Sequence, residues 1–262
     1  MDDTAFKRIL DCMALSWTGY RRVRKAVKRR LHRRMMEIGA ATVEDYLQII
    51  RQDPVERETA GILLTVSISR FFRDRRMWEA LGELITETDW RGWSSCTAWC
   101  AGCACGEEVH SLKILWQELS DAAPLPTLNI IATDVDASLL DRARQGRYPP
   151  SSLREVDEAL KQRYFTKTGS EFVILKELAR GIHWTLHDFT AAPPPCTRCD
   201  LIFLRNNLLT YYDTAIAIPA LERIAGALRD GGLLIVGNNE RLPGGDLPLK
   251  ATLACRSIFR KL

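Results

Sequence analysis

The chain has 262 residues, of which 46% are hydrophobic and 27% are charged, and its formal net charge is +4. This is ordinary globular composition, and it excludes a disordered chain, a collagen-like rod and a coiled coil. There is no uninterrupted apolar run of 18 residues and no secretion signal at the acidic start, so we expect a cytoplasmic protein without membrane insertion.

Residues 1 to about 64 are predicted to be helical. Apolar residues recur there at three- and four-residue spacing, as on one stripe of a helix: Tyr20, Val23, Val27, Leu31, Met35 and Ile38. Gly39 is a plausible end for this helix, and Thr42 and Pro54 are plausible starts for two more. We therefore expect an N-terminal helical domain with its linker over residues 1–75.

The predicted helix over 21–34 is strongly basic and contains no acid. It carries Arg21, Arg22, Arg24, Lys25, Lys28, Arg29, Arg30, Arg33 and Arg34. The rest of the chain has 28 basic and 33 acidic residues, a net charge of −5. A basic element on an acidic body suggests an anionic partner, although a plain helical domain with a solvated basic face has the same pattern. Nucleic acid is disfavoured because no aromatic stacking residues are interleaved among the basic ones.

From residue 76 onward, helical patterns alternate with short apolar runs. The runs lie at 96–101, 128–133, 172–175, 182–186, 200–204, 232–237 and 252–260, and helices are expected at 76–88, 107–120, 137–145, 154–162 and 214–229. Such alternation predicts βαβ units, and continuous apolar runs suit strands covered on both faces. The sequence therefore predicts an α/β domain over 76–262 with a doubly wound, mostly parallel sheet.

Small and acidic residues follow several of the predicted strands. The loop 102–106 (GCACG) precedes Glu107 and Glu108, Asp134 ends the second strand, and Asp188 follows another. Ligands of such sheets bind beyond the carboxyl ends of the strands, and an acid at the second strand suits a ribose diol. The loop has no lysine for phosphates. Taken singly, a glycine loop can be a tight turn and an acid can be a helix cap. Together they favour the cationic cofactor S-adenosylmethionine (SAM) over NAD or ATP.

Several longer motifs resemble those of the CheR family, the chemotaxis-receptor glutamate O-methyltransferases. They are TVSISRFFRD (65–74), AWCAGCACGEEVHSL (98–112), IIATDVDASLLDRARQGRY (130–148), QRYF (162–165), DLIFLRNNLLTYYD (200–213) and GGLLIVGNNE (231–240). The resemblance runs from about residue 20 to the end of the chain. It implies a small all-α domain, a Rossmann-like SAM-dependent methyltransferase domain and a small β insertion at about 164–186.

The resemblance also implies the site residues. The implied cofactor contacts are Ser67, Ser69, Arg73, Gly102, Glu108, Asp134, Asp188, Phe189, Asn206 and Asn207. Glu108 would take the ammonium or amino-acid end of SAM, Asp134 the ribose, and Asp188 with Phe189 the adenine. The implied catalytic residues are Arg73, which would orient the acceptor carboxylate, and Tyr211, which would line the methyl-transfer channel. An alternative for Arg73 is a local pair with Asp74.

The sequence departs from the family pattern at several positions. Ser67 and Ser69 stand where the family usually has Asn and Thr, and Val109-His110 replaces Pro-Tyr. The RNN block has one extra residue, and 238–240 (NNE) replaces His-Ser-Glu. These changes are compatible with a SAM pocket. They affect the specificity that is expected for the methyl acceptor. We expect His110 to be a packing or exposed residue.

The implied reaction methylates glutamate side chains of a chemoreceptor-like protein and leaves S-adenosylhomocysteine (SAH). A glutamate with a pKa of about 4.3 is already ionised, so no general base is needed. The basic helix 21–34 would dock a monomeric enzyme to acidic receptor helices. The alternatives are a related methyltransferase acting on another protein or on nucleic acid, and a non-catalytic SAM- or SAH-binding module.

The eight cysteines are expected to be reduced thiols in a cytosolic protein. They are Cys12, Cys96, Cys100, Cys103, Cys105, Cys196, Cys199 and Cys255. Cys196 and Cys199 have zinc-knuckle spacing, but even with Cys96 they give only three ligands. We therefore expect no metal site.

Overall fold

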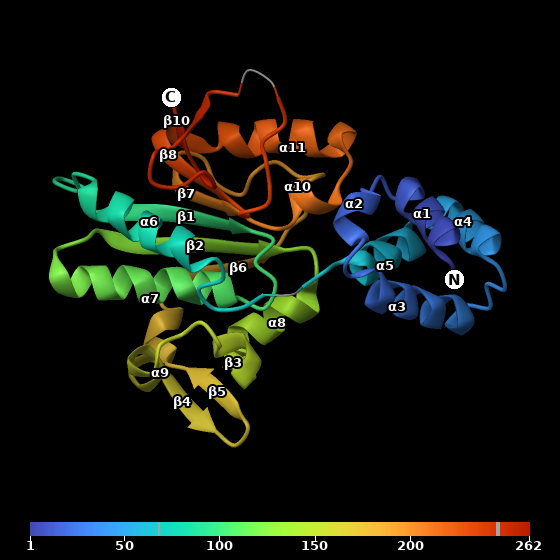
Figure 1. Cartoon of the computed structure of the whole chain (residues 1–262), viewed down its shortest axis with the longest axis horizontal. Coiled ribbons are helices and arrows are strands. Elements are labelled where there is room, and N and C mark those ends of the chain that lie inside the picture. The colour runs from blue at the N-terminus through green and yellow to red at the C-terminus, as the bar shows by residue number, and fades with distance from the viewer. Residues whose placement is uncertain (68, 245–246) are drawn as a thin grey trace. The chain divides into compact units, whose positions relative to one another are not determined.

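The computed structural model describes residues 1–67, 69–244 and 247–262 (Figure 1). The chain divides into two compact units. The helical unit comprises Met1–Ser67 and Asn206–Pro219, and the sheet unit comprises Ile68–Arg205 and Ala220–Leu262.

The helical unit begins with a run of helices, as the sequence predicts. They are α1 (Asp3–Cys12), α2 (Trp17–Tyr20), α3 (Arg24–Glu37), α4 (Val43–Gln52) and α5 (Pro54–Leu64). The side chain of Thr42 and that of Asp45 form a reciprocal capping box at the start of α4, and Pro54 occupies the first turn of α5. The unit also contains α10 (Leu208–Tyr211) and α11 (Thr214–Gly226) as far as Pro219.

The core of the helical unit is apolar and continuous. The predicted stripe of α3 faces it, with Val27, Leu31 and Met35 buried against residues of α1, α4 and α5. Val23 and Ile38 flank this stripe and are only partly buried. The apolar periodicity therefore identified the inward face of α3 correctly, because the helix can bury only one side.

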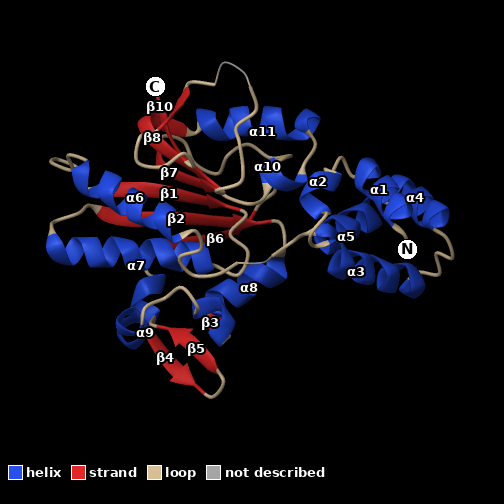
Figure 2. Cartoon of the chain, in the orientation of Figure 1, coloured by secondary structure: helices blue, strands red, loops and turns tan. Residues whose placement is uncertain are grey.

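Seven strands of the sheet unit form one sheet in the order β6-β2-β1-β7-β8-β10-β9. They are β1 (Ser95–Ala101), β2 (Thr127–Asp134), β6 (Ile182–Leu186), β7 (Cys199–Leu204), β8 (Leu228–Val236), β9 (Leu249–Ala251) and β10 (Ile258–Lys261). From β6 to β8 neighbouring strands are parallel, and β10 is antiparallel to both β8 and β9. This confirms the predicted Rossmann-like, mostly parallel sheet (Figure 2).

Helices of the sheet unit follow the strands in the expected alternation. They are α6 (Arg75–Glu87), α7 (Glu107–Ala122), α8 (Ala137–Gln145), α9 (Glu158–Tyr164) and the rest of α11, with short 3-10 turns at Pro150–Leu153 and Lys176–Ala179. Apolar residues of α6 and α7 pack on β1, β2 and β7, and Trp78 stacks on Phe203 with ring centroids 5.6 Å apart. Every residue of β7 is buried, as expected for a central strand covered on both faces.

The small β insertion has different bounds from the expected 164–186. It consists of β3 (Arg147–Tyr148), β4 (Phe165–Thr168) and β5 (Glu171–Ile174) in the antiparallel order β3-β5-β4. The predicted strand at 172–175 belongs to this small sheet, whereas β6 pairs in parallel with β2 in the large sheet. β4 and β5 form a hairpin with a short turn, whereas the pairing of β2 with β6 joins segments far apart in the chain, which local patterns do not report.

Among the described residues, no helix is both long and apolar enough to cross a bilayer. Cys196 and Cys199 are joined by a disulfide. Their Cα atoms lie 6.6 Å apart, which is within the range that a disulfide can bridge. The expectation of reduced thiols is therefore wrong for this pair. The other cysteines in the described ranges are free thiols.

Candidate active site

The glycine loop between β1 and α7 is fixed to the end of β2. The backbone N–H groups of Gly102 and Cys103 both donate to the carbonyl oxygen of Thr133, at 2.8 Å. Gly106 has φ +84°, and a Cβ there would lie 2.8 Å from the Trp184 ring and 3.0 Å from Cβ of Ala143. Only glycine fits this position, so the loop stays close to β2 and β6.

Asp134 ends β2 and is 5% exposed. Its carboxylate accepts hydrogen bonds from the backbone N–H of Ala104 (2.9 Å) and of Asp136 (3.0 Å). Burial raises the pKa of Asp134, and these two hydrogen bonds oppose the rise. The cap of α8 is Asp136, whose side chain accepts from the N–H of Ser138. Asp134 is therefore not a helix cap, and it stands at the strand end where a ribose ligand is expected.

Glu108, in the first turn of α7, is held by a buried arginine that the sequence analysis did not select. Arg205 directly follows β7, and its side chain is 3% exposed. Its Nη1 donates to Oε2 of Glu108 (2.7 Å), and its Nη2 donates to Oδ2 of Asp74 (2.8 Å) and to the carbonyl oxygen of Arg73 (2.9 Å). Burial raises the pKa of Glu108, while the positive charges of Arg205 and Arg73 oppose the rise. The sequence signals for Arg205 were its place after a buried strand and within the family-like motif at 200–213.

The same cluster contains Arg73 and Asp74, the two residues of the local pair that was considered as an alternative. The carboxylate of Asp74 pairs with Arg205. The guanidinium of Arg73 acts electrostatically on Glu108, and its carbonyl oxygen accepts from both Arg205 and the indole N–H of Trp78 (3.0 Å). Arg73 is thus fixed by its backbone within reach of the charge of Glu108.

Glu107, the other acid of the loop, is also buried and was not predicted as a site residue. Its Oε1 accepts from the hydroxyl of Ser152 (3.2 Å), and the side chain of Ser69 forms a hydrogen bond with it. Burial raises the pKa of Glu107. Ser69, a predicted cofactor contact, is thereby brought to the start of α7.

Asp188 and Phe189 come just after β6, beside Asp134. The backbone N–H of His187 donates to the carbonyl oxygen of Asp134 (3.0 Å). Asp188 accepts from the N–H and the hydroxyl of Thr190, and Phe189 is buried. The sheet unit therefore contains Ser69, Arg73, Gly102, Glu108, Asp134, Asp188 and Phe189 from the predicted set.

The remaining predicted residues, Ser67, Asn206, Asn207 and Tyr211, belong to the helical unit. Ser67 is exposed at the end of its first segment. Asn207 directly precedes α10, and its carbonyl oxygen accepts from the N–H of Tyr211 (2.9 Å), the last residue of that helix. The ring of Tyr211 lies 5.0 Å from that of Tyr20. Chain connectivity places this segment directly after β7 and Arg205.

His110 is 1% exposed and lies among aromatic rings. Its ring centroid is 6.0 Å from that of Tyr148 and 5.8 Å from that of Trp184. Burial lowers the pKa of His110 to about 4. It is a neutral packing residue.

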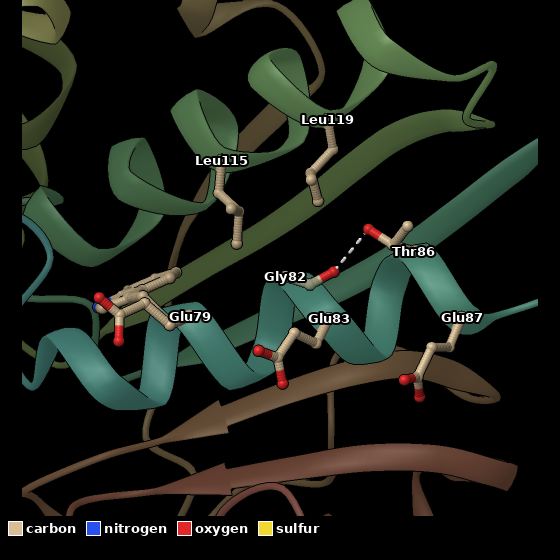
Figure 3. A pocket seen from close by; sticks show the side chains of 8 residues that line it. Glu79, Gly82, Glu83, Thr86, Glu87, Leu115 and Leu119 are labelled. Atoms are coloured by element: carbon tan, nitrogen blue, oxygen red, sulfur yellow. Dashed lines mark hydrogen bonds between the residues drawn. The ribbon is translucent and has the colours of Figure 1, made fainter.

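A groove of about 540 Å³ runs between α6 and α7 (Figure 3). Leu115 and Leu119 point from α7 toward α6, and Glu79, Glu83 and Glu87 line its α6 side. None of the predicted cofactor contacts lines this groove. Gly102, Asp134 and Asp188 of the predicted set lie instead beyond or at the carboxyl ends of strands.

Comparisons with known proteins identify the family of this chain. A family model described as "CheR methyltransferase, SAM binding domain" matches residues 67–255, and one described as "CheR methyltransferase, all-alpha domain" matches residues 22–62. The chain belongs to the CheR methyltransferase family. It is a SAM-dependent methyltransferase, and the predicted resemblance and cofactor are confirmed.

Several relatives are similar over most of this CheR-family chain. Chemotaxis protein methyltransferase 2 of Pseudomonas aeruginosa is 30% identical over 80% of this chain and 76% of its own length. The chemotaxis protein methyltransferase of Listeria innocua is 28% identical over 82% of this chain and 81% of its own. An uncharacterized 104.1 kDa protein of Rhodobacter capsulatus is 30% identical over 82% of this chain, which spans only 23% of that relative.

Proposed function

We propose that this protein transfers the methyl group of SAM to glutamate side chains of chemoreceptor-like proteins in the cytoplasm, forming methyl esters and SAH. The observation that carries the proposal is the likeness to relatives named chemotaxis protein methyltransferase over about four fifths of the chain. The buried acidic groups at the strand ends support it, because they suit a cationic cofactor.

The residues present fit SAM. Asp134 keeps lone pairs for the ribose hydroxyls after accepting its two backbone hydrogen bonds. Arg205 bonds only Oε2 of Glu108, so this carboxylate keeps lone pairs for the ammonium of the methionine end. Asp188 and Phe189 would flank the adenine, with Gly102 giving close backbone approach. The further proposed contacts are Ser67, Ser69, Arg73, Asn206 and Asn207.

The chain needs to supply little chemistry beyond positioning. Bound SAM supplies an activated methyl group on its sulfonium, and the acceptor carboxylate is already ionised at neutral pH. The fork of Arg73 matches a carboxylate and would orient it for in-line attack. Tyr211 would line the channel through which the methyl group passes. Arg205 assists by fixing the backbone of Arg73. Catalysis is then mainly orientation and exclusion of water.

The basic helix α3 would dock the acceptor with only part of its charge. Arg24 and Lys28 pair with Asp3, Arg34 pairs with Glu56, and Arg30 donates to the carbonyl oxygen of Thr65. The exposed basic residues of the 21–34 segment are Arg21, Arg22, Lys25, Arg29 and Arg33. We propose that this narrower set contacts acidic receptor helices by charge complementarity.

The acceptor can be tested with two receptor fragments. The protein would be incubated with methyl-labelled SAM and a cytoplasmic chemoreceptor fragment, or with the same fragment whose methylatable glutamates are changed to glutamine. We expect label on the first fragment and at least a tenfold lower rate on the second. Equal labelling of both fragments would contradict a glutamate acceptor and would favour another methylated group.

A further inference from the structure

The segment that carries Tyr211 is paired with the connection between α1 and α2. The backbone N–H of Ser16 donates to the carbonyl oxygen of Tyr211 (2.8 Å), and that of Asp213 donates to the carbonyl oxygen of Ala14 (3.0 Å). Leu15 and Tyr212 form an antiparallel bridge between these bonds. Residues 14–16 and 211–213, almost 200 positions apart in the chain, therefore share a short two-stranded contact.

Gly19 brings α2 against the backbone of α10. A Cβ on Gly19 would overlap the carbonyl oxygen of Thr210 and would lie 2.9 Å from its carbonyl carbon and 3.0 Å from Cδ1 of Tyr211. Most of these contacts are with backbone, which cannot rotate away as a side chain can. Any side chain at residue 19 must displace α10 or tilt α2, so a glycine is required for this approach.

Tyr20, the next residue, connects Tyr211 to the end of α5. Its ring lies 5.0 Å from the ring of Tyr211, and its hydroxyl donates to the carbonyl oxygen of Leu64 (3.0 Å). Tyr20 is 2% exposed. These contacts and its burial leave it little freedom, so it holds the Tyr211 ring in a defined place within the helical unit.

We propose that α2, through Gly19 and Tyr20, is a positioning element that fixes Tyr211 for methyl transfer. This rests on the proposed role of Tyr211 in the methyl-transfer channel. The all-α part of the chain thereby contributes to the reaction rate as well as to acceptor docking. A displacement of Tyr211 by about 1 Å lowers the rate by as much as about 100-fold when orientation is the main source of catalysis.

The test compares Gly19→Ala with Gly61→Ala in the full chain. Gly61 lies within α5 of the same unit, and its added Cβ would meet nothing closer than Cε of Met13 at 3.8 Å. We expect Gly19→Ala to lower kcat at least tenfold and to leave the Kd for SAH within about threefold. Gly61→Ala should leave both unchanged. Tyr20→Leu removes the ring beside Tyr211 without crowding α10, and it should lower kcat at least fivefold. It replaces Gly19→Ala in the test if that variant does not fold.

Two more measurements separate positioning from a general structural role. Hydrogen exchange should become faster at the amides of Ser16 and Asp213 in Gly19→Ala, with α4 still protected. In a Tyr211→Ala background the kcat cost of Gly19→Ala should disappear, because the two residues act through one contact. Unchanged exchange, an unchanged kcat, or a full cost in the Tyr211→Ala background would each overturn the proposal. If the unmodified protein transfers no methyl group, that result counts against the proposed function. The hydrogen-exchange measurement would still decide whether α2 holds residues 211–213 in place.

Discussion

Nη1 of Arg205 lies 2.7 Å from Oε2 of Glu108, and this ion pair joins the end of β7 to the start of α7. Both side chains are largely buried, and Arg205 also bonds Asp74 and the backbone of Arg73. One guanidinium thus fixes three segments that the proposed site requires. Arg205 bonds Oε2 of Glu108, and the same carboxylate would accept from the ammonium at the methionine end of SAM in the proposed site.

Replacing Arg205 with methionine should strongly destabilise the protein. The variant leaves the carboxylates of Glu108 and Asp74 without their partner, and breaking a buried pair in this way costs about 3–5 kcal/mol. Urea unfolding followed by circular dichroism would measure the loss.

Arg75→Met is the control, because Arg75 is 60% exposed and pairs with Glu79 and Asp157 on the surface. Its cost should stay below about 1 kcal/mol. Similar losses in both variants would contradict a special role for the Arg205 cluster.

Asp134→Ala should remove most of the affinity for SAH. The variant loses the proposed ribose acceptor and also releases the N–H of Ala104 in the glycine loop. Titration calorimetry should show a Kd raised by at least about 100-fold, equivalent to about 2.7 kcal/mol. Asp141→Ala, an exposed position on α8, is the matched control and should bind normally. An unchanged Kd for Asp134→Ala would show that the cofactor binds elsewhere.

The loop and Asp134 could be predicted from sequence because their signals are local. Small residues between a buried strand and a helix, followed by acids, predict a tight turn at a strand end, and Gly106 shows why the turn needs glycine. The alternating apolar runs likewise predicted the mostly parallel sheet, since covered strands must be apolar on both faces.

Other parts of the site depend on contacts between distant segments, which local patterns do not encode. Arg205 lies 97 positions from Glu108, and nothing around either residue indicates the pair. Contacts between distant segments also assign residues 206–219 to the helical unit. They likewise pair β6 with β2 in the large sheet. The Cys196–Cys199 disulfide was missed because the chain was expected to be cytosolic, and that expectation outweighed the short spacing.

His110 should make the protein sensitive to acid. Burial lowers its pKa to about 4 from an ordinary value of 6.5, so the unfolded chain binds a proton in that range that the folded chain does not. Stability is therefore lost as the pH falls from 6.5 to 4, by about 3 kcal/mol. The raised pKa values of Glu107, Glu108 and Asp134 act in the opposite direction, so a comparison of variants is needed.

The comparison is between His110→Phe and His183→Gln. Phenylalanine keeps a ring beside Tyr148 and Trp184 but cannot take up the proton, whereas His183 is exposed on β6. We expect the free energy of unfolding of His110→Phe to fall less between pH 6.5 and pH 4, while His183→Gln follows the unmodified protein. Parallel curves for all three proteins would show that His110 does not titrate on unfolding in this range.

Charge reversal on α3 should weaken acceptor binding without slowing the chemical step. The triple variant Lys25→Glu, Arg29→Glu, Arg33→Glu changes exposed residues only. We expect KM for a receptor fragment to rise at least tenfold, kcat to stay within twofold, and the salt dependence of KM to become weaker. Lys250→Glu, on the exposed strand β9, should leave KM unchanged. A fall in kcat with unchanged KM would contradict docking through α3.

The nature of the methylated product tests the central claim most directly. The protein would be incubated with methyl-labelled SAM and membranes that contain its own chemoreceptors, and the labelled proteins would then be treated with alkali. A carboxyl methyl ester hydrolyses to volatile labelled methanol, whereas an N-methyl group is stable. We predict that most of the protein-bound label becomes volatile. Label that remains on the protein after alkali would keep the fold and the cofactor but would contradict glutamate methylation.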